Sequence, residues 1–253
     1  MHIETIGQGP SLVLIHGWAL HGGVFAPLVS RLSSRFRLHL IDLPGHGHSR
    51  EDSTPLALPH VVSQVAAATP PAVWLGWSLG GLFALHAAAT QPQVRGLAMI
   101  AATPRFVTGE GWPHAVDTAV FTQFAQDLAQ DYRGTLERFL ALDTIGSEHA
   151  RTELRTLKQA LVARGEPAPR ALQEGLQLLR RTDLRRALSA LDKPSLWLAG
   201  QRDRLVPAAS MHDAAALSPR AQAHTIAGGG HAPFLGHADE VAARLEQFVA
   251  ALD

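Results

Sequence analysis

The sequence predicts an α/β fold in which helices cover both faces of a mostly parallel β-sheet, with a helical segment inserted between two strands. Short apolar runs rich in β-forming residues alternate with longer runs of helical periodicity, which is typical of βαβ units. Most of the strand-like runs are apolar nearly throughout rather than alternating, so both sheet faces should be covered. A chain of 253 residues is long enough to bury such a core.

The predicted elements follow the chain in order. Strands are expected at residues 11–16, 36–41, 72–76, 94–101, 195–199 and 223–226, where the runs are short and apolar. Helices are expected at residues 24–33, 58–68, 80–91 and 238–251, where apolar residues recur at helical spacing.

The pattern changes between residues 105 and 187, where no good strand is visible. Apolar residues recur there at helical spacing, as at Phe121, Phe124 and Leu128. The helical pattern ends near Pro194, which disfavours helix in the residue before it. We therefore expect residues 1–104 and 188–253 to form the core, and residues 105–187 to form a helical lid, called the insertion below.

Composition excludes several classes of function. The absence of cysteine removes disulfides, thiol nucleophiles and cysteine-based metal sites. The 22 basic residues balance the 22 acidic ones, which argues against a nucleic-acid partner. No run of 18 apolar residues and no export signal occurs, so we expect no membrane association and a cytoplasmic location.

The strongest local motif is the segment GWSLGG around Ser78. It directly follows a predicted strand and precedes a predicted helix. A serine alcohol is a poor nucleophile, and a sharp strand-to-helix turn presents it where a base can reach it. Glycines at 76 and 80 allow that turn without side-chain collision. Ser78 is the candidate nucleophile.

A nucleophilic serine needs a base, and the base needs an acid that orients it. His231 is the candidate base, because three glycines precede it and place it on a loop after the last predicted strand. Asp203 is the candidate acid, because it follows the strand at 195–199 and lies between serine and histidine in chain order.

The developing oxyanion needs backbone N–H donors. Leu79 follows the nucleophile at the start of a helix, where free N–H groups favour negative charge. A second donor should come from the loop after the first predicted strand, where we choose Trp18.

Together these motifs, with the segment DLPGHGHS that begins at Asp42, resemble the α/β-hydrolase superfamily over essentially the whole chain. The superfamily implies an eight-stranded, mostly parallel sheet with a helical lid after the sixth strand. Finer details, including ERFLAL at 137–142 and HAPF at 231–234, resemble the carboxylesterases of biotin synthesis. Members of that family cleave the methyl ester of pimeloyl-acyl carrier protein.

This resemblance implies a monomeric serine carboxylesterase without metal or cofactor, with an acyl carrier protein as partner. The substrate-binding residues that it implies are Trp18, Ser78, Leu79, Phe139, Leu140, Ala141, Leu142, Asp143 and His231. Acyl carrier proteins are acidic, and residues 133–186 hold 11 of the 22 basic residues against seven acidic ones. We expect the carrier to dock on Arg138, Arg151, Arg155 and Lys158. The position where the family tends to place a further lid arginine is Gly134 here.

Other functions remain as alternatives. A broad-specificity short-chain carboxylesterase or a carbon–carbon bond hydrolase would use the same motifs, and the fold also supports receptors and inert scaffolds. Dehalogenases and epoxide hydrolases need an aspartate where this chain has Ser78. His46-Gly47-His48 lacks further metal ligands and is interpreted as a turn. No glycine-rich dinucleotide motif follows the first predicted strand.

Overall fold

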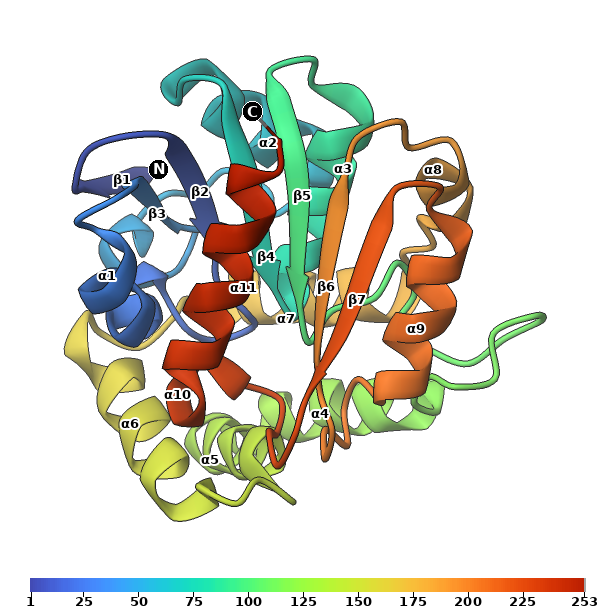
Figure 1. Ribbon diagram of the computed structural model, residues 1–253. Coiled ribbons are helices and arrows are strands. Elements are labelled where there is room, and N and C mark those ends of the chain that lie inside the picture. Colours follow the sequence, from blue (N-terminus) through green and yellow to red (C-terminus); the bar gives the residue numbers. More distant parts are fainter. Residues whose placement is uncertain (253) are drawn as a thin grey trace.

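A seven-stranded β-sheet forms the centre of the computed structural model, which describes residues 1–252 (Figure 1). The strands are β1 (His2–Ile6), β2 (Ser11–Ile15), β3 (Arg37–Asp42), β4 (Ala72–Trp77), β5 (Val94–Ile100), β6 (Ser195–Gly200) and β7 (Ala221–Ile226). Their order across the sheet is β1-β3-β2-β4-β5-β6-β7. β1 is antiparallel to β3, and every other neighbouring pair is parallel.

The sheet confirms the predicted α/β class and corrects its details. The six predicted strands occur within two residues of their expected bounds, but β1 was missed. β1 is a five-residue edge strand whose side chains are mostly half-buried, so its apolar pattern is weak. The superfamily resemblance implied eight strands with the lid after the sixth. Within the described residues there are seven, and the helical segment follows β5.

Six helices flank the sheet: α1 (Ala26–Leu32), α2 (Leu58–Ala68), α3 (Leu79–Thr90), α9 (Ala208–Leu217), α10 (Pro233–Gly236) and α11 (Ala238–Ala250). α11 packs beside α1 on one face, and α2 packs beside α3 on the other (Figure 1). The sequence missed α9, because its alanine-rich segment has little contrast between apolar and polar faces. The start of the helix expected at 24–33 is a 3-10 turn, Gly22–Phe25.

The connection between β5 and β6 contains five helices: α4 (Thr118–Gln130), α5 (Tyr132–Thr144), α6 (Ala150–Ala163), α7 (Pro169–Arg181) and α8 (Arg185–Ser189). α4, α5 and α6 lie below the carboxyl ends of the strands (Figure 1). A loop with two isolated bridges, Val107 to Val116 and Gly109 to Trp112, precedes them. The division into core and insertion remains our proposal, and residue 253 of the expected core lies outside the described residues.

An ion-pair cluster attaches the end of α6 to the sheet. Arg164 contacts Asp42 at the end of β3, with Nη1 3.2 Å from Oδ2, and also pairs with Glu4 of β1. The Asp42 side chain is fully buried and accepts hydrogen bonds from the backbone N–H groups of Gly22 and His48. These donors and Arg164 hold a charge that burial alone would disfavour. None of the described helices combines the length and apolar character needed to cross a membrane.

Candidate active site

Ser78 lies on the sharp turn between β4 and α3. Its φ of 53° and ψ of −123° place a non-glycine residue in a strained conformation. The adjacent glycines are required, because a Cβ atom on Gly80 would lie 2.1 Å from the carbonyl oxygen of Ile15. A Cβ atom on Gly76 would lie 2.4 Å from the carbonyl oxygen of Gly80. The turn holds the hydroxyl at the carboxyl edge of the sheet, as a strand-to-helix nucleophile requires.

His231 lies on the loop between β7 and α10, and its Nε2 is 2.8 Å from the hydroxyl oxygen of Ser78. Two hydrogen bonds made by the backbone of His231 fix the position of this loop. Nε1 of Trp77 donates to the carbonyl oxygen of His231 at 2.8 Å. The backbone N–H of His231 donates to the carbonyl oxygen of Asp143 at 3.1 Å. The structure therefore brings the candidate base into contact with the candidate nucleophile.

Asp203 follows β6, and its Oδ2 is 2.8 Å from Nδ1 of His231. The other carboxylate oxygen accepts hydrogen bonds from the backbone N–H groups of Leu205 and Val206, at 2.8 and 2.9 Å. Because the carboxylate is an acceptor, Nδ1 of His231 carries the proton and Nε2 is free to accept one from Ser78.

The site is closed to solvent, since Ser78 is 2% exposed and His231 is 1% exposed. Burial by itself lowers the pKa of His231, but the charge and hydrogen bond of Asp203 raise this pKa above its ordinary value. The same carboxylate stabilises the imidazolium that forms when the histidine accepts a proton. This arrangement can carry out nucleophilic acyl transfer.

The two predicted oxyanion donors flank Ser78. Leu79 is the first residue of α3, and the first N–H groups of a helix have no partner within the helix. The loop that contains Trp18 passes beside the nucleophile, because a Cβ atom on Gly17 would lie 3.2 Å from Cβ of Ser78. The indole Nε1 of Trp18 donates to the carbonyl oxygen of Leu172 in α7 at 2.8 Å.

The stretch from Phe139 to Asp143 lies on α5, next to the loop of His231. The Phe139 ring packs on the Trp18 ring with centroids 4.6 Å apart. Asp143 is 1% exposed, and neither carboxylate oxygen has a hydrogen-bond partner among the described residues. Burial raises the pKa of Asp143 to about 7. Leu140 belongs to the hydrophobic core, while Ala141 and Leu142 are half-buried.

The predicted docking residues lie on the surface of the insertion. Arg151, Arg155 and Lys158 are on the exposed face of α6, whereas Leu157 and Leu161 on the same helix are buried. Within residues 1–252, Arg151 and Arg155 form no ion pair, and Lys158 pairs with Glu137 at 3.0 Å. Arg138, on α5, is already engaged with Asp127 and Asp131. Arg151 and Arg155 are therefore the more available cations.

Sequence reasoning missed two residues that shape the site. The indole of Trp77 holds the loop of His231, although the residue was noted only as part of the serine motif. Gly175 lies in α7 against the loop that contains Trp18, where a Cβ atom would be 2.7 Å from Cδ1 of Trp18. A glycine inside an amphipathic helix lowers the stability of the helix. Its presence in the sequence could have indicated that a neighbouring group packs too closely there for a side chain.

The segment His46-Gly47-His48 is a turn, as predicted. Gly47–Ser49 form a 3-10 turn, and Nδ1 of His46 lies 3.0 Å from the carbonyl oxygen of Pro44. His16 supports the same region, because its Nε2 accepts a hydrogen bond from the backbone N–H of Leu43 at 3.0 Å. His16, whose ring lies 5.1 Å from that of His46, therefore links the end of β2 to the turn after β3.

Comparison with known proteins identifies the relatives of this chain. A family model described as the alpha/beta hydrolase fold matches residues 10–238. Over 252 residues the chain is 75% identical to a pimeloyl-(acyl-carrier protein) methyl ester esterase of Xanthomonas oryzae pv. oryzae, covering 100% of both chains. A relative of the same name from Stenotrophomonas maltophilia is also 75% identical, with 97% of its length covered. An esterase structure from Exiguobacterium antarcticum superposes with a TM-score of 0.88 at 20% identity, covering 98% of this chain and 95% of that one. The chain belongs to the alpha/beta hydrolase fold family.

Proposed function

We propose that this protein is a serine carboxylesterase that hydrolyses the methyl ester of pimeloyl-acyl carrier protein, releasing methanol and the free acid in biotin synthesis. The observation that carries the proposal is the hydrogen-bonded series Ser78, His231 and Asp203, with both contacts at 2.8 Å. The relatives that share 75% of the sequence over its full length bear the name of this esterase, which supports the methyl ester as substrate.

The reaction proceeds in two acyl-transfer steps. His231 takes the hydroxyl proton of Ser78 while the serine oxygen attacks the ester carbonyl. The N–H groups of Leu79 and Trp18 stabilise the tetrahedral oxyanion. His231 then protonates the departing methanol, and a water molecule repeats the sequence on the acyl-enzyme to release the carboxylic acid. Asp203 keeps the imidazole in one tautomer throughout.

The carrier docks on α6 in this proposal. Arg151, Arg155 and Lys158 border a hollow of about 400 Å³ that also includes Leu154 and Val162. Val162 is 65% exposed, so an apolar contact lies among the cations. A basic, partly apolar surface suits an acidic helical partner and increases the rate of encounter.

Docking at a fixed distance from the triad accounts for the choice between two acyl bonds. The substrate has a thioester at the carrier end and a methyl ester at the far end. If α6 holds the carrier, the length of the acyl chain determines which carbonyl reaches Ser78. A broad-specificity esterase or a carbon–carbon bond hydrolase has no need for such a basic surface.

The direct test is methanol release from pimeloyl-acyl carrier protein methyl ester, measured by mass spectrometry beside shorter and longer diacid chains. We expect release that is fastest with the pimeloyl chain. Ser78→Ala should lose several orders of magnitude in turnover. Ser63→Ala, on the exposed side of α2, is the matched control and should retain full turnover. Labelling by a sulfonyl fluoride should modify wild type and not Ser78→Ala.

The two parts of the proposal fail separately. Release of methanol by Ser78→Ala at the wild-type rate would exclude Ser78 as nucleophile. Labelling of Ser78 without hydrolysis of any carrier-bound ester would retain the serine hydrolase and exclude this substrate.

A further inference from the structure

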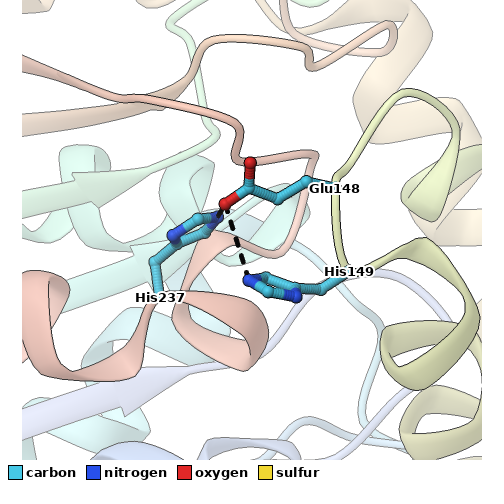
Figure 2. Close-up of side chains that lie close together, drawn as sticks. All are labelled: Glu148, His149 and His237. Carbon is cyan, nitrogen blue, oxygen red and sulfur yellow. Dashed lines mark ion pairs between the residues drawn. The ribbon is translucent and has the colours of Figure 1, made fainter.

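A cluster of potential metal ligands lies outside the triad, where the insertion meets the core. Figure 2 shows the side chains of Glu148, His149 and His237 pointing toward one another. One ligand atom from each lies within 4.8 Å of the other two. Glu148 and His149 come from the connection between α5 and α6, and His237 comes from the end of α10.

Two of the three distances between the ligand atoms are close to those around a tetrahedral metal. Oε1 of Glu148 lies 3.6 Å from Nε2 of His149 and 3.7 Å from Nε2 of His237. Two atoms bound to one zinc ion at about 2.1 Å in tetrahedral geometry lie about 3.4 Å apart. Small side-chain rotations therefore bring these three atoms to coordination distance.

A second observation supports a ligand here. Glu153 is 1% exposed, and neither of its carboxylate oxygens has a hydrogen-bond partner among the described residues. It lies one helical turn after His149, and its Oε1 and the Cδ2 atom of His149 both face Gly236. A buried carboxylate without partners is costly, and a neighbouring cation removes that cost.

Two glycines of the core make room for the cluster. A Cβ atom on Gly228 would lie 2.4 Å from the carboxyl carbon of Glu148. A Cβ atom on Gly236 would lie 2.5 Å from Oε1 of Glu153 and 2.7 Å from Cδ2 of His149. These glycines stand on either side of His231 along the chain. The backbone N–H of Glu148 also donates to the carbonyl oxygen of Gly228 at 3.1 Å.

We propose that Glu148, His149 and His237 bind a zinc-class divalent ion, with water at the fourth position and Glu153 as a nearby charge-balancing carboxylate. Imidazole and carboxylate ligands suit zinc, whereas magnesium prefers oxygen ligands alone. The ion links the α5–α6 connection to the segment that follows His231. It uses none of the triad atoms, so its role is to fasten the insertion to the core.

The test measures zinc binding to the untagged, metal-free full chain by calorimetry. We expect one Zn²⁺ per chain, and a rise in Tm of about 5 °C at a hundredfold excess over Kd. Mg²⁺ should produce neither effect. Co²⁺ should give the visible absorption bands of a tetrahedral site. His149→Asn, His237→Asn and Glu148→Gln should each weaken Zn²⁺ binding at least tenfold.

His60→Asn is the matched control, because His60 is exposed on α2, away from the cluster. It should bind Zn²⁺ as wild type does. Absence of stoichiometric binding to wild type would overturn the proposal. Equal binding by wild type, His149→Asn and His237→Asn would also overturn it, as would loss of binding in His60→Asn. The far-ultraviolet circular dichroism of each variant checks that the fold is retained.

Discussion

The backbone N–H of His231 donates a 3.1 Å hydrogen bond to the carbonyl oxygen of Asp143, so α5 of the insertion directly supports the loop of the candidate base. The side chain of Asp143 is buried beside this loop with both carboxylate oxygens unpartnered among the described residues. Its negative charge contributes to the raised pKa of His231, after the larger contribution of Asp203. Asp143 therefore influences the base through both its backbone and its charge.

Replacing Asp143 by asparagine should move the acid limb of the pH–rate profile to lower pH. The ionised carboxylate favours the imidazolium, and its removal lowers the pKa of His231, which must be neutral to act as base. The acid limb of the wild-type profile should also extend over a wider pH range, because the interacting side chains of Asp143 and His231 titrate together. The measurement is kcat/KM for p-nitrophenyl acetate against pH. Asp127→Asn on α4 is the control, and an identical shift in both variants would contradict the prediction.

The same substitution should change the pH dependence of stability. Burial raises the pKa of Asp143 from 3.8 to about 7, so the folded state retains a proton that the unfolded state releases. The stability that depends on this retained proton of Asp143 is fully present below pH 3.8 and is lost as pH rises through 7. Asp143→Asn should therefore gain stability relative to wild type between those values, by a few kcal/mol. Thermal unfolding at pH 5 and pH 8 measures this gain, and a constant difference would contradict it.

Gly175→Ala should destabilise the protein, although alanine favours helix over glycine by about 1 kcal/mol. The new Cβ atom would lie 2.7 Å from Cδ1 of Trp18, and the Trp18 ring is held by Leu172 and Phe139. Overpacking of this kind costs about 1–3 kcal/mol, which exceeds the gain in helix propensity. Esterase turnover should fall as well, because Trp18 is the proposed second oxyanion donor. Urea unfolding and kcat for p-nitrophenyl acetate test both effects, and a more stable, fully active variant would contradict them.

Charge reversal on α6 should affect the carrier-bound substrate selectively. Arg151→Glu, Arg155→Glu and Lys158→Glu together should lower kcat/KM for the carrier-bound ester about tenfold or more at low salt. The loss should shrink as ionic strength rises. Hydrolysis of p-nitrophenyl acetate should not change, because the triad is untouched.

The control for α6 is a single reversal of the same kind at a distant site. Arg186 is exposed on α8, on the opposite side of the molecule from α6 (Figure 1). Arg155→Glu alone should lower kcat/KM for the carrier-bound ester, whereas Arg186→Glu should leave it unchanged. Equal losses on the carrier-bound and small esters would exclude docking on α6.

Arg164→Ala should destabilise the fold by about 3 kcal/mol, because it leaves the fully buried side chain of Asp42 without its counter-ion. Arg35→Ala removes a surface ion pair with Glu246 and should cost less than about 1 kcal/mol. The free energy of unfolding in urea, measured for both variants, compares the buried ion pair with the surface ion pair. A cost for Arg164→Ala no greater than that for Arg35→Ala would show that Asp42 is held by its backbone donors alone.

The sequence was most informative where function depends on local geometry. The strand, turn and helix around Ser78 occupy one short segment, so residue order alone indicated the nucleophile and its glycines. The chain order of Asp203 and His231 then selected the remaining members of the triad. Six of the seven strands were predicted for a similar reason, because most of them are short runs of mainly apolar residues.

Features that depend on distant segments were not predictable in this way. Nothing near Asp143 in the chain indicates that its carboxylate is buried beside His231. Glu148 and His237 are separated by 89 positions in the numbering, and only the folded chain brings them together. The weak edge strand β1 and the alanine-rich helix α9 gave too little periodic contrast to be detected.

The hydrogen bond from the Trp18 indole to the carbonyl oxygen of Leu172 ties the loop of Trp18 to α7 of the insertion. Trp18 contributes both an expected backbone N–H donor for the oxyanion and this side-chain bond to α7. An outward movement of α7 would therefore break the bond and release the loop that holds the donor. We expect the open enzyme to admit substrate but to stabilise the tetrahedral intermediate poorly. Catalytic activity would then return only when α7 moves back against Trp18.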